Sequence, residues 1–159
     1  MEALVAEMKH GYASTLAMYE SVLKNCTDEI WWKEFPGAPF WREAYHAIFW
    51  MHTHLGRKEK EFLFHPFGPD IDPRLFTPPN NTCELAEARS FAARTRVYID
   101  EVFNTMTVEE LAGRDDYNEQ KFRCVFHRLM YGLRHAQHHV GKLATYLDAE
   151  GVTVDHWAG

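Results

Sequence analysis

Cysteine is scarce in this chain. The 159 residues include three cysteines, and Cys26, Cys83 and Cys124 lie far apart. No two of them have the short spacing that is typical of zinc sites or redox-active motifs. We therefore expect neither a disulfide framework nor cysteine-based metal chemistry, and predict free, partly buried thiols.

Long apolar runs and basic clusters are also missing. No stretch approaches the length of about 18 apolar residues that a membrane span requires. The N-terminal residues carry acids and lack an apolar signal core, so no secretory peptide is predicted. The formal net charge is −6, and no cluster of Lys and Arg resembles a nucleic-acid footprint. We therefore expect a cytoplasmic protein without a membrane or nucleic-acid partner.

The apolar residues that are present repeat with a helical period. They make up 46% of the chain, enough for one globular domain over residues 1–159. Spacings of three and four residues predict helices over 2–25, from 39 or 40 to 55, 82–106 and 122–148, the last starting near Asn118, with a short turn at 107–111. No strand signal is found. The fold class predicted is all-α, a four-helix bundle.

The stretch between the second and third predicted helices has a different character. Residues 61–81 hold five prolines among several phenylalanines and follow no period. Loops of this length in compact domains are usually functional or disordered. The many aromatic residues favour a packed cover, so we predict a long irregular crossover. Asn81, followed by Glu84, resembles a capping box at the start of the third helix.

Two histidines in the last helix have the spacing of metal ligands. His135 and His139 are four residues apart, so their side chains project from one face of the helix. Imidazole is a good ligand for zinc, nickel, copper and iron, and three protein ligands with one open position are typical of catalytic zinc sites. The best third ligand is His46, which lies in an apolar stretch of the second helix. A buried His46 hydrogen-bonded to a tyrosine or a backbone carbonyl is the alternative.

Other residues are candidates for supporting roles. His52 is the main rival of His46 as third ligand, and His138 is expected at the rim of the site or against another subunit. Glu43, one turn before His46, could orient a ligand or act as a base. Tyr45 and Tyr12 are further acid–base candidates.

The histidine motifs resemble those of a known family. The segment His135-Ala136-Gln137-His138-His139-Val140-Gly141-Lys142-Leu143 is similar to the last-helix motif of the DinB/YfiT superfamily of metalloproteins, and residues 39–50 are similar to its second-helix segment. The resemblance implies a four-helix bundle, often dimeric, with zinc or nickel held by His46, His135 and His139. Some relatives are thiol-dependent transferases or isomerases that use bacillithiol, mycothiol or glutathione.

These features lead to three hypotheses. The first is a metal-dependent enzyme, a thiol S-transferase or a hydrolase, acting on a small-molecule substrate with or without a thiol cosubstrate. The second is a non-catalytic, stress- or damage-associated metal-binding bundle. The third is a dimeric helical bundle whose histidines bind nothing.

Overall fold

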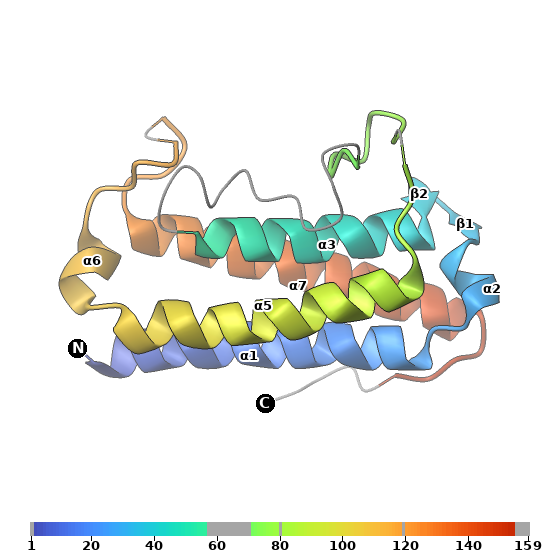
Figure 1. The fold of residues 1–159 in the computed structure, drawn as a ribbon, viewed down its shortest axis with the longest axis horizontal. Helices are drawn as coiled ribbons and strands as arrows, with labels where there is room; N and C mark the ends of the chain where they lie inside the picture. The colour runs from blue at the N-terminus through green and yellow to red at the C-terminus, as the bar shows by residue number, and fades with distance from the viewer. Residues whose placement is uncertain (1, 57–70, 80, 119, 155–159) are drawn as a thin grey trace.

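Four long helices form most of the molecule (Figure 1). The computed structural model describes residues 2–56, 71–79, 81–118 and 120–154. The long helices are α1 (Glu2–Asn25), α3 (Phe40–Leu55), α5 (Leu85–Thr105) and α7 (Val125–Ala149). Both α1 and α3 pack against α5 and α7. The predicted all-α class is confirmed.

The predicted inner faces of these helices are buried. In α1 they are the positions that follow the helical period, namely Val5, Met8, Tyr12, Leu16, Tyr19 and Leu23. Helix α3 is buried on most of its faces, because α5 and α7 pack on it and segment 71–79 contacts it through Arg42 and His46. Polar side chains on α3 therefore need partners inside the protein, which bears directly on its histidines.

Helices α3 and α5 run in the same direction (Figure 1). The chain must therefore return along the molecule between them, which accounts for a long crossover. Much of the predicted cover, namely residues 61–70, lies outside the described residues. Residues 71–79 contain no helix or strand. Ile71 is buried, but the Phe76 side chain is 81% exposed, so the prediction of a packed aromatic cover is wrong at Phe76.

Two small elements between α1 and α3 were not predicted. Helix α2 (Asp28–Trp31) starts at Thr27, whose hydroxyl accepts a hydrogen bond from the Ile30 amide. Strands β1 (Glu34–Phe35) and β2 (Ala38–Pro39) then pair in antiparallel fashion. Gly37 lies between them with φ of 102°, a value that suits glycine after proline in a tight turn. Elements this short carry no measurable period, so helical or strand spacing could not predict them.

Two predicted helix starts are corrected. Helix α5 begins after Glu84, whose amide donates to the Glu87 carboxylate, and Asn81 does not cap it. Helix α7 begins at Val125, and neither Asn118 nor Phe122 is part of it. Instead, the Asn118 carbonyl accepts from the Phe122 amide in a separate turn, which buries the Phe122 ring.

The predicted turn at 107–111 is present as helix α6 (Val108–Ala112), which has a capping box between Thr107 and Glu110. Within the described residues, no helix combines the length and the apolar character that a membrane crossing requires.

Candidate metal centre

Three histidines meet where α3 packs against α7. The Nε2 atoms of His46, His135 and His139 lie 3.1 Å from one another in each of the three pairings. The two α7 residues are one turn apart, and His46 faces them from the middle of α3. The structure therefore brings together the three residues that the sequence singled out, as a group that could hold a metal ion.

The ring of His46 is fixed by the crossover segment. Its Nδ1 lies 2.5 Å from the carbonyl oxygen of Pro73. A carbonyl only accepts, so Nδ1 carries the proton and Nε2 presents a lone pair. Burial lowers the pKa of His46 to about 4, against the opposing effect of this hydrogen bond. The imidazole is therefore neutral at pH 7, the form that binds metals.

His139 is fixed by a buried carboxylate. Its Nδ1 donates to Oε1 of Glu43, a side chain with no exposed surface. The Lys142 ammonium lies 2.7 Å from the same oxygen. Burial alone would raise the pKa of Glu43, but the hydrogen bonds from His139 and Lys142 outweigh it and lower the pKa to about 2. The carboxylate is thus ionised, and its bond to Nδ1 orients the His139 ring with Nε2 toward the other two histidines.

The third ring, His135, is held by packing. It stacks on Tyr131 with ring centroids 5.9 Å apart and an interplanar angle of 18°. Its Nδ1 is buried and has no hydrogen-bond partner among the described residues. Burial lowers its pKa to about 3, with neighbouring His139 and His46 acting in the same direction. His135 is therefore also neutral at pH 7.

The arrangement fits a divalent ion better than it fits three histidines alone. Two nitrogens bound to one zinc ion at about 2.0–2.1 Å and at a tetrahedral angle lie about 3.3 Å apart. The 3.1 Å separations are close to that value. The Nε2 lone pair of His46 points into this triangle, where a cation would stabilise it. Outer hydrogen bonds that fix the tautomer of each ligand are a regular feature of metal sites.

The remaining described histidines lie outside this group. His52, the rival third ligand, points to α5 instead, where Nδ1 is 3.2 Å from the Thr95 hydroxyl and the ring stacks on Tyr98. His54 donates from Nδ1 to the Trp50 carbonyl. His138 is exposed, with its ring edge-on to His139, so a role at the rim or in a subunit contact stays a prediction.

The three predicted acid–base candidates, Glu43, Tyr12 and Tyr45, have different contacts in the structure. Glu43 contacts His139, which favours the orienting role over that of a base. Tyr12 donates to the Leu129 carbonyl of α7 at 2.9 Å, and Tyr45 is fully buried beside Phe49. Burial raises the pKa of both tyrosines, so both phenols are protonated at pH 7. Their catalytic roles stay predictions.

Sequence reasoning missed three contributors. The Pro73 carbonyl lies in a segment without a period, so nothing in the sequence pointed to it. Lys142 follows His139 by three residues and thus shares its face, a spacing that could have suggested it. Gly132 allows a close approach of helices, because a Cβ atom there would lie 2.6 Å from both His54 Cβ and Tyr12 Oη.

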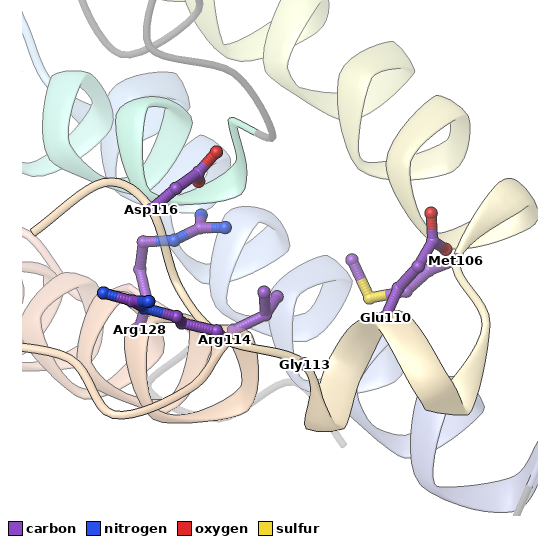
Figure 2. A pocket seen from close by; sticks show the side chains of 7 residues that line it. Met106, Glu110, Gly113, Arg114, Asp116 and Arg128 are labelled. Carbon is purple, nitrogen blue, oxygen red and sulfur yellow. The ribbon is translucent and has the colours of Figure 1, made fainter. Parts of the chain in front are cut away.

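A separate hollow lies between the end of α5, helix α6 and the first turns of α7 (Figure 2). It measures about 530 Å³, and its lining includes side chains of both charges. The lining residues are Met106, Glu110, Gly113, Arg114, Asp116, Val125 and Arg128. Arg128 is buried and contacts Asp115, with 2.6 Å between Nε and Oδ2. This ion pair ties the first turns of α7 to the preceding loop, which is a structural role.

Comparisons of the chain with family models, curated proteins and solved structures found no match. The site must therefore be interpreted from its own geometry and from the resemblance of its motifs.

Proposed function

We propose that this protein is a metal-dependent enzyme built on a four-helix bundle of the DinB/YfiT type. His46, His135 and His139 are the ligands, and the reaction is thiol S-transfer or hydrolysis of a small molecule. The observation that carries the proposal is the triangle of Nε2 atoms, 3.1 Å on each side. A homodimer is part of the proposal and rests on the resemblance alone, while a cytoplasmic location stays the prediction made from the sequence.

Three nitrogen ligands suit a catalytic site more than a structural one. Structural zinc sites are usually closed by four protein ligands, whereas catalytic sites keep an open position. No fourth His, Cys, Asp or Glu joins the triad among the described residues. His46 and His135 are partly exposed, so a small molecule can approach. Zinc or nickel bound here would act as a Lewis acid and lower the pKa of a coordinated water or thiol.

The protein's own residues have defined parts in this proposal. Glu43 and the Pro73 carbonyl orient two of the ligands from behind, and Tyr131 covers one face of His135. Because the charge of Glu43 is already shared between His139 and Lys142, this carboxylate serves orientation rather than proton transfer. An acid or base for the reaction would come from Tyr12, Tyr45 or the substrate itself.

The test is the visible spectrum of the cobalt-substituted protein, recorded with and without a small thiol. An open position predicts that the thiol changes the cobalt bands and adds a sulfur-to-metal charge-transfer band. Turnover assays for thiol transfer and for ester hydrolysis would follow, each with the apoprotein as control. A cobalt spectrum that does not change when a thiol or azide is added would contradict the proposed enzyme and favour the non-catalytic metal-binding bundle.

A further inference from the structure

Lys142 completes a charged network behind the candidate metal centre. Helix α3 supplies Glu43 and His46, which are three residues apart, and α7 supplies His139 and Lys142, also three residues apart. Residues with this spacing share a helix face, so the two pairs oppose each other where the helices pack. Both His139 Nδ1 and Lys142 Nζ are bonded to one and the same atom, Oε1 of Glu43.

Burial makes the position of the Glu43 carboxylate depend on its partners. Almost none of the Glu43 side chain is exposed, and Oε2 has no hydrogen-bond partner among the described residues. An ionised carboxylate in such surroundings is costly unless a cation compensates it. The His139 imidazole supplies one hydrogen bond, from Nδ1 to Oε1. Lys142 supplies the compensating charge.

Lys142 is placed to hold the carboxylate from the solvent side. Its side chain is 31% exposed, while that of Glu43 is 1% exposed, so the ammonium keeps part of its hydration. The ammonium also lies 6.0 Å from the centre of the Tyr146 ring, one turn further along α7. The lysine can therefore stabilise Glu43 without losing all of its own hydration.

We infer that Lys142 is a positioning residue of the metal centre and acts through Glu43. It keeps Oε1 in the place where that atom fixes the tautomer and orientation of His139. Without Lys142, the carboxylate loses its only cationic partner among the bonds described above, and the His139 ring loses its fixed direction. This inference rests on the proposed function, because it requires that the triad binds a metal.

The experiment is a double-mutant cycle in zinc affinity, measured by competition with a chromophoric chelator. The proteins are the wild type, Lys142→Met, Glu43→Gln and the double variant. Loss of an outer-shell partner usually weakens metal binding by about 10–100-fold. We expect about a tenfold loss for K142M, a larger loss for E43Q, and a double variant within about twofold of E43Q. This non-additivity is what a lysine acting through Glu43 must show.

Two further variants separate charge from folding. Lys142→Arg keeps a cation that can reach Glu43, and should bind zinc within about threefold of the wild type. Arg134→Met removes an exposed cation from the same helix and should leave zinc affinity unchanged. Circular dichroism of each apoprotein checks that the helices are intact. If K142M does not fold, the cycle is run with Lys142→Gln.

Several outcomes would overturn the inference. Wild-type affinity in K142M, a loss in K142R as large as in K142M, or losses of K142M and E43Q that multiply in the double variant would each exclude action through Glu43. In these cases the wild type still binds zinc, and the proposed function stands. A wild type that binds no zinc would overturn both.

Discussion

His52 is a buried imidazole outside the metal centre, and it should make stability depend on pH. Burial lowers its pKa to about 4, and the charge of Arg94 acts in the same direction. The unfolded chain takes up a proton near pH 6.5, whereas folded His52 resists protonation down to about pH 4. The contribution of His52 to the free energy of unfolding is therefore fully present above pH 6.5 and is lost as the pH falls toward 4.

The prediction is measured by urea unfolding at pH 7.5 and at pH 4.5, with a chelator present so that metal binding does not contribute. The wild type should lose stability on acidification, and His52→Asn should lose less, by on the order of 2 kcal/mol. Asn keeps a polar group near Thr95 but does not titrate. An equal loss in both proteins would contradict the account.

At the level of residues, the sequence predicted the grouping of the three histidines better than the residues around them. His135 and His139 were found because a helix places residues four apart on one face. His46 was ranked over His52 by its apolar context and by the resemblance, and the structure agrees with that ranking. The contact of His46 with the Pro73 carbonyl and the contact of Lys142 with Glu43 each join residues far apart in the chain. Helical spacing predicts neighbours within one helix and gives no information about such contacts.

At the level of elements, the contact between α3 and α7 depends on Gly132. A methyl group at this position would lie 2.6 Å from His54 Cβ and from Tyr12 Oη. The Tyr12 hydroxyl is also bonded to the Leu129 carbonyl, so neither neighbour can move freely. Because the two helices carry the three histidines, a shift here would be transmitted to the histidine triad.

We predict that Gly132→Ala destabilises the protein by about 1–3 kcal/mol, the usual cost of overpacking, and weakens zinc binding. Gly141→Ala is the matched control in the same helix, since nothing lies within 4 Å of the added methyl group. It should stabilise the protein by up to about 1 kcal/mol, because alanine favours helix over glycine. Urea unfolding measures both. A G132A protein as stable as G141A would refute the close-packing argument.

Long elements were predicted from the sequence more accurately than short ones. The four long helices have enough turns for a period to emerge, and their inner faces are the predicted ones. Helix α2 and the β1–β2 pair are too short for a period. The start of α7 was misplaced because Phe122 fits the apolar stripe by spacing, although it is buried from a preceding turn.

At the level of the whole molecule, the sequence predicted the helical class but not the course of the chain. Helices α3 and α5 run in the same direction, because the long crossover returns the chain along the molecule before α5 begins (Figure 1). The crossover also brings Pro73 back over α3, next to His46. The histidine triad is therefore a product of tertiary packing, assembled from α3, α7 and segment 71–79.

Metal content tests this account most directly. Tag-free protein is analysed by elemental mass spectrometry, beside the His46→Ala, His135→Ala and His139→Ala variants, with His52→Ala as control. We expect close to one zinc or nickel ion per chain in the wild type and in H52A, and none in the three triad variants. Wild-type protein that carries no metal, and takes none up on reconstitution, would contradict the central claim.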